Sequence, residues 1–399
     1  MPLCRVLLRN QRFLFFFLYF TDYVHPKVPC IIRNAIPSSS LNNNLLDSSN
    51  NEDGQLSLTL DDIINYVGEQ IKLTVDVTPD GHGDAVRTVS YTVGDSEDTE
   101  GDEPTTSESF DSNDRGERLK KMFVKPHEQE MSLAEFRSLL RSKHAVNNNQ
   151  CHEHLDYNER VIYPLAEAQT QQTKEAATQQ TGLHSTQVNH PVVYYSRQND
   201  CLRTEMSSLF STGLFPSTFP FAEEAFGTGP PDAVNVWIGN ERSVSSMHKD
   251  HYENLFYVCS GQKEFILNPP ADILFLHEGE FSCGTFRPCI NQSGELNNVS
   301  WTVVPEKDET HDKYATTRWI EPDMKRCLDG KYKRDKYQLL EKSNPIKVLV
   351  SQGEMLYIPS LWLHRVTQTI ETVGVNYWYD MKFDNQWCYF NFVQQLRQK

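Results

Sequence analysis

The chain lacks the sequence features of membrane, zinc-finger and disulfide-rich proteins. No apolar run in its 399 residues approaches the ~20 residues of a membrane span. Its nine cysteines include no CxxC pair, and a zinc finger needs cysteines paired at short spacing. The hydrophobic fraction is 38%, below the usual ~45–50%, so part of the chain is expected to lie outside any core.

Basic residues are also in short supply. The 38 Lys and Arg residues stand against 54 Asp and Glu, which gives a net charge of −16. This balance argues against a phosphate-binding surface over the whole protein. We therefore expect a protein partner, with no nucleic acid and no membrane. The aromatic run at 13–20 lacks a small-residue cleavage pattern, which favours the cytoplasm and leaves the nucleus and a secretory signal as alternatives.

Two polar segments interrupt the first half of the chain. Residues 95–114 contain nine acidic side chains and no Lys or Arg, and residues 145–190 are rich in Asn, Gln and Thr. Both compositions are typical of disordered insertions. The predicted organisation is an N-terminal α+β part that carries both insertions (1–190), a barrel (191–382) and a C-terminal helix (383–399).

Short regular elements are predicted around these insertions. The apolar run at 29–36 and the alternation at 72–77 each predict a strand. A short helix is expected over 58–67, where Thr59 precedes two Asp residues. Ser132 and Glu135 form a capping box, which predicts the start of a second helix.

Beyond residue 191 the pattern changes to short strands with tight turns. The segments 255–259 and 263–267 flank a Gly-containing turn and predict a hairpin, and 348–350 with 355–358 predict another. Residues 234–238 alternate as a further strand. We therefore expect a mainly β fold with flanking helices, arranged as a barrel or jelly roll.

The end of the chain predicts an amphipathic helix over 387–398. Its apolar residues Phe390, Val393 and Leu396 are spaced by three. This helix packs on its own barrel or, with Phe392, forms a homodimer contact, and the sequence leaves both open.

One constellation of residues predicts a metal site. His248 and Asp250 are two residues apart in an extended segment, so their side chains point to the same face. His364 follows the strand pattern at 357–363 and is the candidate for a third ligand. Two histidines and one carboxylate form the facial triad of non-haem Fe(II) oxygenases. That triad leaves positions open for a 2-oxoacid and dioxygen.

Lys263 is the candidate for binding the co-substrate. It lies after the predicted hairpin turn among apolar neighbours such as Phe265 and Leu267. A buried lysine needs a partner charge, and a carboxylate of 2-oxoglutarate would supply one.

These motifs resemble a known family. The segments 232–239 and 248–255 are similar to the JmjC oxygenases, and 29–35, 77–87 and 375–380 narrow the resemblance to its lysyl-hydroxylase members. The resemblance implies a double-stranded β-helix, the cupin-like jelly roll, which binds Fe(II) and 2-oxoglutarate.

The resemblance also implies roles for eight residues of this sequence. Fe(II) would be held by His248, Asp250 and His364, the catalytic set. Co-substrate contacts would come from Lys263, Ser245, Asn254, Tyr194 and Asn376.

The activity implied is (3S)-hydroxylation of a lysine in developmentally regulated GTP-binding proteins, with dioxygen as oxidant. Three alternatives stay open. They are N-methyl demethylation of histones, cleavage of histone tails at methylated arginines, and a non-catalytic cupin-like binding module. The absence of an H-E-x-x-H motif weakens the peptidase alternative.

Overall fold

The computed structural model describes residues 5–7, 19–36, 56–91, 111–112, 118–142, 162–164, 191–289, 296, 299–308, 314–330 and 336–396. The two predicted insertions therefore lie mostly outside the described residues. Each contains one short strand that composition did not predict, β5 (Asp111–Ser112) and β8 (Ile162–Pro164).

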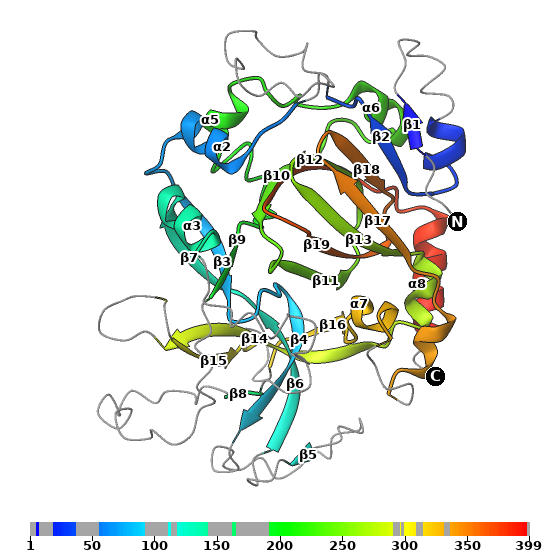
Figure 1. Cartoon of the computed structure of the whole chain (residues 1–399). Coiled ribbons are helices and arrows are strands. Elements are labelled where there is room, and N and C mark those ends of the chain that lie inside the picture. The colour runs from blue at the N-terminus through cyan, green and yellow to red at the C-terminus, as the bar shows by residue number, and fades with distance from the viewer. Residues whose placement is uncertain are drawn as a thin grey trace.

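Two β-sheets at the centre of the molecule form its barrel (Figure 1). The larger sheet has the order β1-β2-β18-β12-β20-β10. Its strands are β1 (Arg5–Leu7), β2 (Cys30–Arg33), β18 (Glu354–Ile358), β12 (Tyr252–Ser260), β20 (Thr372–Asp380) and β10 (Ala233–Gly239). The smaller sheet, with the order β11-β19-β13-β17, consists of β11 (Val244–His248), β19 (Leu363–Gln368), β13 (Gln262–Asn268) and β17 (Ile346–Ser351).

The strands from β10 to β13 alternate between the two sheets, and so do those from β17 to β20, as in a jelly roll, while β13 and β17 pair within the smaller sheet. The two predicted hairpins are therefore wrong. β12 pairs with β18 and β20, whereas β13 pairs with β17 and β19, so Gly261 turns the chain from one sheet into the other. Gly353 does the same between β17 and β18. Both glycines have positive φ, 78° and 81°, which suits a turn inside a sheet as well as one between sheets, so turn chemistry does not reveal the pairing.

The interior between the sheets is packed with aromatic and branched aliphatic side chains. They come from alternate positions of strands in both sheets, as the two-residue period of a strand requires. The cluster includes Trp237, Phe256, Val258, Phe265, Leu267, Val348, Val350, Leu356, Ile358, Val366 and Trp378. A narrow cavity lies among these side chains between the two sheets.

Two further sheets lie outside the barrel. One has the order β15-β14-β6-β4-β8, with β16 added to β14 and β5 to β6, and the other has the order β7-β3-β9. Their strands are β3 (Lys72–Thr78), β4 (Ala85–Tyr91), β6 (Arg118–Lys125), β7 (His127–Ser132), β9 (Val192–Tyr194), β14 (Glu278–Cys289), β15 (Ser300–Pro305) and β16 (Thr316–Ile320). Strands from before residue 191 pair with strands after it in β2–β18, β3–β9 and β6–β14.

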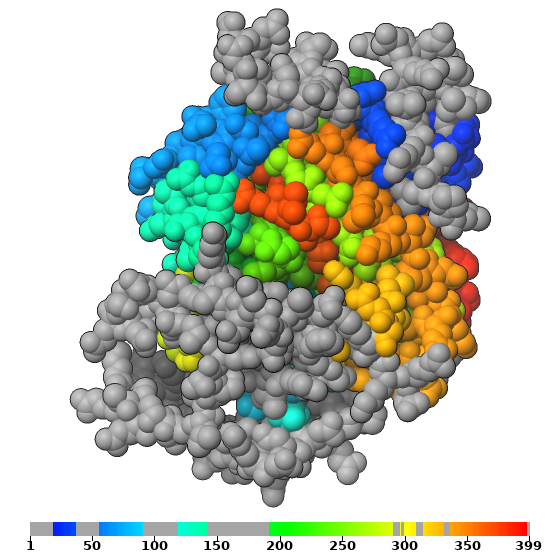
Figure 2. Space-filling model, viewed as in Figure 1, coloured from blue at the N-terminus to red at the C-terminus, as the bar shows by residue number. Residues whose placement is uncertain are grey.

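Both predicted N-terminal helices are confirmed. They are α2 (Leu60–Val67), capped by Thr59 and Asp62, and α3 (Leu133–Leu140), capped by Ser132 and Glu135. Each is a capping box in which two side chains satisfy backbone N–H groups at the helix start. Figure 2 shows the two helices, blue and teal, side by side on the surface.

The remaining helical segments are short. They are η1 (Phe20–Val24), α5 (Ser207–Phe210), α6 (Pro220–Phe226), η4 (Pro270–Leu274), α7 (Met324–Leu328) and η5 (Gln338–Lys342). No helix in the described ranges is long and apolar enough to cross a membrane.

The C-terminal helix α8 (Asn385–Leu396) packs on the outer face of the smaller sheet. Phe390 and Val393 are buried in a cluster with Met247 and Ile266. Leu396 is half exposed, so the predicted apolar stripe is wrong at its last position because the helix ends beyond the edge of the core. Phe392 is 57% exposed, and its role in a homodimer stays a prediction.

Candidate metal centre

The two histidines of the candidate triad meet across a pair of strands. His248 is the last residue of β11 and His364 the second residue of β19, and the two are register partners. A shift of register between Ser245 and His248 marks an irregularity in β11 just before the metal ligand. The ring centroids of the two histidines lie 4.2 Å apart.

Asp250 completes the group from the loop after β11. Its Oδ2 lies 3.5 Å from Nε2 of His364 and 4.0 Å from Nε2 of His248. The three ligand atoms all lie within 4.8 Å of one another. Two imidazole nitrogens and one carboxylate oxygen at these separations suit Fe(II) or a similar divalent ion.

The outer nitrogens of both imidazoles are already hydrogen-bonded. His248 Nδ1 donates to the Ser246 carbonyl at 2.7 Å, and His364 Nδ1 donates to the Trp362 carbonyl at 2.9 Å. A carbonyl can only accept, so Nδ1 carries the proton and Nε2 keeps its lone pair for a metal. The structure therefore fixes the metal-binding tautomer of both rings.

The protonation states also suit metal binding. Burial, with the nearby charge of His364, lowers the pKa of His248 to about 4, so its ring is neutral at pH 7. Burial would raise the pKa of Asp250, but its interactions with His364 and His248 outweigh burial and lower that pKa. Neutral imidazoles and an ionised carboxylate are the forms that bind metal.

Lys263 borders the same cavity as the triad and is buried, with only 1% of its surface exposed. Its Nζ donates to Tyr194 Oη at 3.2 Å and lies 4.5 Å from the ring centroid of Phe256. Burial lowers the pKa of Lys263 to about 7. No carboxylate of the described residues forms an ion pair with it, so an anionic ligand fits this position.

All eight residues predicted for the site border one cavity between the sheets. They are Tyr194, Ser245, His248, Asp250, Asn254, Lys263, His364 and Asn376. Asn376 accepts from the Trp237 indole at 2.8 Å and donates to Asn254 Oδ1 at 3.2 Å. These hydrogen bonds hold the two amides in the cavity wall. The cavity contains both the cation of Lys263 and the three metal ligands, and this combination suits a 2-oxoacid.

A larger cleft of about 310 Å³ opens in front of the triad. His248 and Asp250 border it, together with residues that sequence reasoning did not select, notably Asp76, Asp84 and Trp319. The Trp319 ring is parallel to the His248 ring, with planes 2° apart and centroids 6.3 Å apart. Asp76 alternates with buried Val75 and Val77, which marks it as facing away from the core but gives no hint of a cleft.

Comparison with known proteins places the chain in a family. The family model described as a cupin-like domain matches residues 17–385. Relatives found over these residues carry JmjC domains. The chain belongs to the cupin-like JmjC family. Members of this family are Fe(II)- and 2-oxoglutarate-dependent oxygenases, which agrees with the triad and the buried lysine.

Individual JmjC relatives carry different names. "Lysine-specific demethylase JMJ32" of Arabidopsis thaliana is 38% identical over 213 residues, 52% of this chain and 58% of that protein. "Bifunctional peptidase and (3S)-lysyl hydroxylase JMJD7" of Homo sapiens is 34% identical over 208 residues, 52% of this chain and 60% of that protein. "JmjC domain-containing protein E" of Dictyostelium discoideum is 28% identical over 342 residues, 84% and 77% of the two chains. The match thus spans about three fifths of the plant and human relatives.

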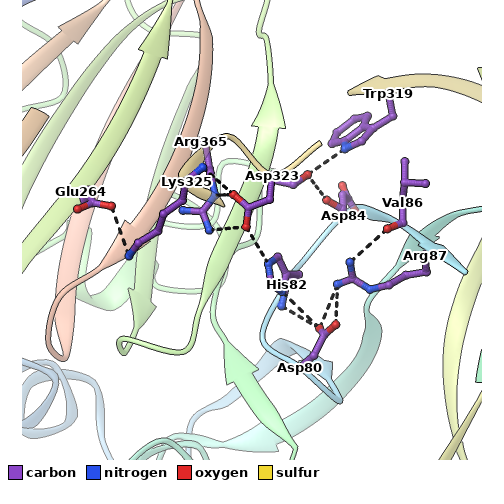
Figure 3. Close-up of polar contacts among 11 residues, drawn as sticks. Asp80, His82, Asp84, Val86, Arg87, Glu264, Trp319, Asp323, Lys325 and Arg365 are labelled. Atoms are coloured by element: carbon purple, nitrogen blue, oxygen red, sulfur yellow. Dashed lines mark hydrogen bonds and ion pairs between the residues drawn. The ribbon is translucent and has the colours of Figure 1, made fainter. Parts of the chain in front are cut away.

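A buried polar network supports the JmjC triad from behind. Figure 3 shows Arg365, the neighbour of His364, reaching Asp323, with His82 between Asp323 and Asp80. The Arg365 Nε lies 2.6 Å from Asp323 Oδ1, and Arg87 pairs with Asp80 at 2.9 Å. Because adjacent strand residues point to opposite faces, β19 directs His364 to the metal side and Arg365 into this network.

Proposed function

We propose that this chain is a protein lysyl hydroxylase that uses Fe(II), 2-oxoglutarate and dioxygen. One observation carries the proposal: a His–Asp–His triad and a buried lysine without a carboxylate partner among the described residues share one cavity in a cupin-like JmjC barrel. The human relative named as a (3S)-lysyl hydroxylase supports the finer assignment. The overall change would convert a C–H bond, dioxygen and 2-oxoglutarate into C–OH, succinate and carbon dioxide.

The residues divide into two binding sets. His248, Asp250 and His364 would hold Fe(II), which when bound with 2-oxoglutarate supplies the oxidising chemistry. Lys263 and Tyr194 would receive the distal carboxylate, which would give Lys263 a charge-assisted hydrogen bond beside its present contact with the Tyr194 hydroxyl. The apolar rings around Lys263 exclude water and strengthen that ion pair.

The proposed substrate is a lysine in a GTP-binding protein of the developmentally regulated class, met in the cytoplasm or nucleus. The net charge of −16 supports association with a lysine-bearing segment, since opposite charges raise the encounter rate. The (3S) stereochemistry is proposed from the name of the human relative.

A second candidate is removal of N-methyl groups from lysine. The plant relative named as a lysine-specific demethylase favours it. Both reactions begin with oxidation of a C–H bond, but demethylation releases formaldehyde and leaves no oxygen on the product.

The two candidates separate in one experiment. Purified protein with Fe(II) and 2-oxoglutarate is incubated with a GTP-binding protein or with an N-methyl-lysine peptide, and succinate, formaldehyde and product mass are measured. Hydroxylation predicts a gain of one oxygen atom on a lysine of the GTP-binding protein, lost in His248→Ala. Formaldehyde with loss of a methyl group would instead establish demethylation, and peptide cleavage would favour the peptidase.

A further inference from the structure

We propose that Asp76 and Asp84 bind the ε-ammonium group of an unmethylated lysyl side chain in the cleft in front of the triad. This inference rests on the proposed function and names the residues that select its substrate. Asp76 lies on β3 and Asp84 immediately precedes β4, so both come from the part of the chain that precedes the barrel.

The position of the two carboxylates points to substrate rather than to the co-substrate. Both border the cleft of about 310 Å³ that also exposes His248 and Asp250. Neither borders the inner cavity that contains Lys263. A lysyl side chain in this cleft would therefore lie near both the aspartates and the metal ligands.

A second, independent observation indicates that this site is built for ligands. Lys263 is almost fully buried, and among the described residues its Nζ contacts only the Tyr194 hydroxyl and aromatic rings. It lines the inner cavity, which shares Tyr194, His248 and Asp250 with the cleft. An unpaired buried cation in the inner cavity calls for an anion there. The outer cleft has the opposite unpaired charge.

The other charged groups at the cleft have partners. Glu278 pairs with Lys249 at 3.2 Å and with Arg318 at 3.4 Å. The carboxylates of Asp76 and Asp84 form no ion pair with a described residue, although Ser196 donates a hydrogen bond to Asp76. They are thus the negative charges of this cleft that remain for a cation.

The groups that face the two aspartates do not neutralise them. Lys125 and Arg197 are the nearby cations, and they are engaged by Glu306 at 2.8 Å and by Glu128 at 2.5 Å. Burial, together with neighbouring carboxylates, raises the pKa of both Asp76 and Asp84 to about 6. A bound ammonium would relieve this repulsion, which is a favourable contribution to binding.

The chemistry of the walls favours a free ammonium over a methylated one. Carboxylate oxygens accept hydrogen bonds, and an unmethylated ammonium has three N–H donors to give. A trimethylated ammonium has none and is bound by aromatic faces instead. The rings of Trp237 and Trp319, which also line the cleft, would contact the methylene chain of the lysine.

Equilibrium binding tests the inference without requiring turnover. Four fluorescent peptides share the sequence of a lysine-bearing segment of a GTP-binding protein and differ only at the central position, which is lysine, trimethyl-lysine, acetyl-lysine or norleucine. Binding is measured by anisotropy on protein loaded with Mn(II) and 2-oxoglutarate. We expect the lysine peptide to bind at least tenfold more tightly than the other three.

Variants assign the preference to the two aspartates. Asp76→Asn and Asp84→Asn should each weaken binding of the lysine peptide about tenfold and leave the norleucine peptide unchanged. Asp84→Glu keeps the charge and should retain most of the preference. Glu130→Gln removes a carboxylate from a surface ion pair with Lys72 and serves as the matched control, expected to bind like the wild type.

The outcomes separate this inference from the proposed function. A preference for the lysine peptide that disappears in both Asn variants supports the inference. If no lysine gains oxygen in the same protein, that result contradicts only the proposed function. Equal binding of all four peptides, or unchanged preference in folded Asn variants, overturns the inference even if hydroxylation occurs.

Discussion

The Nδ1 nitrogen of His248 lies 2.7 Å from the carbonyl oxygen of Ser246, two residues earlier on the same strand. The side chain of Ser246 accepts from the Trp319 indole at 2.9 Å and donates to the Asp84 carbonyl. One residue therefore connects a metal ligand with two residues of the outer cleft. The orientation of the His248 ring and the shape of the cleft therefore depend on the same residue, Ser246.

Loss of a triad residue should weaken metal binding strongly. His248→Ala removes one of two nitrogen ligands, so we expect Mn(II) affinity, measured by calorimetry, to fall at least a hundredfold. His251→Ala is the matched control, because His251 is exposed, packs against Trp387 with ring centroids 5.0 Å apart, and borders neither the cleft nor the inner cavity. Equal loss in both variants would contradict the assignment of His248.

Replacing Lys263 should separate co-substrate binding from stability. Lys263→Met removes the proposed partner of the distal carboxylate, so the KM for 2-oxoglutarate should rise about a hundredfold, in line with ~2–3 kcal/mol for a buried charge-assisted contact. The apo variant should be more stable than the wild type at neutral pH, because it buries no unpaired cation. Lys325→Met, at a half-exposed position that does not border the cavity, is the control.

The wild-type apo protein should become more stable as pH rises from about 7 to 10. The pKa of Lys263 is about 7 in the folded state, against 10.5 for an ordinary lysine. Between these values the unfolded chain binds the extra proton, so the free energy of unfolding increases with pH. Urea denaturation should show a rise on the order of 3–4 kcal/mol relative to Lys263→Met. If the wild type and Lys263→Met show the same pH dependence, the stability change does not come from Lys263.

Acid should weaken binding of the lysine peptide. The pKa values of Asp76 and Asp84 lie near 6, so the cleft loses negative charge as the pH falls from 7 to 5. Affinity should fall at least tenfold over this range, and an Asp76→Asn, Asp84→Asn double variant should show a flat profile. An unchanged slope in the double variant would assign the effect to other groups.

Asp323→Asn should destabilise the protein by about 3–5 kcal/mol. It removes the partner of the buried Arg365 and leaves that cation unpaired. Glu130→Gln breaks an exposed ion pair instead, so its cost should stay below about 1 kcal/mol. The midpoints of urea unfolding give both values, and similar midpoints would show that the network has no stabilising role.

Local patterns predicted the residues whose geometry is set within a few positions. The capping boxes and the strand at 72–77 depend on neighbours, and the structure has both. His248 and Asp250 are brought together by local spacing, and the strand pattern at 357–363 selected His364 as the third ligand. The pairing of β11 with β19, which brings His364 to the other two, is a long-range contact. The site residues remain a prediction until ligands are bound.

Long-range pairing could not be predicted in the same way. A glycine turn at 261 allows both a hairpin and a crossing to the other sheet, and the choice depends on strands more than eighty residues away. The place of Asp76 and Asp84 at the cleft depends on how β3 pairs with β9 and on where β4 docks. No periodicity within those strands carries that information.

The pairing of β2 with β18 limits how this chain can be recombined or shortened. A fragment that begins at residue 191 would lose the strand that covers one edge of β18 and would expose unpaired backbone groups there. It would also lose His82 and Asp80, which stand behind the strand of His364. Chimaeras that exchange substrate preference should therefore cross over before residue 30, so that scaffold and selectivity are inherited together.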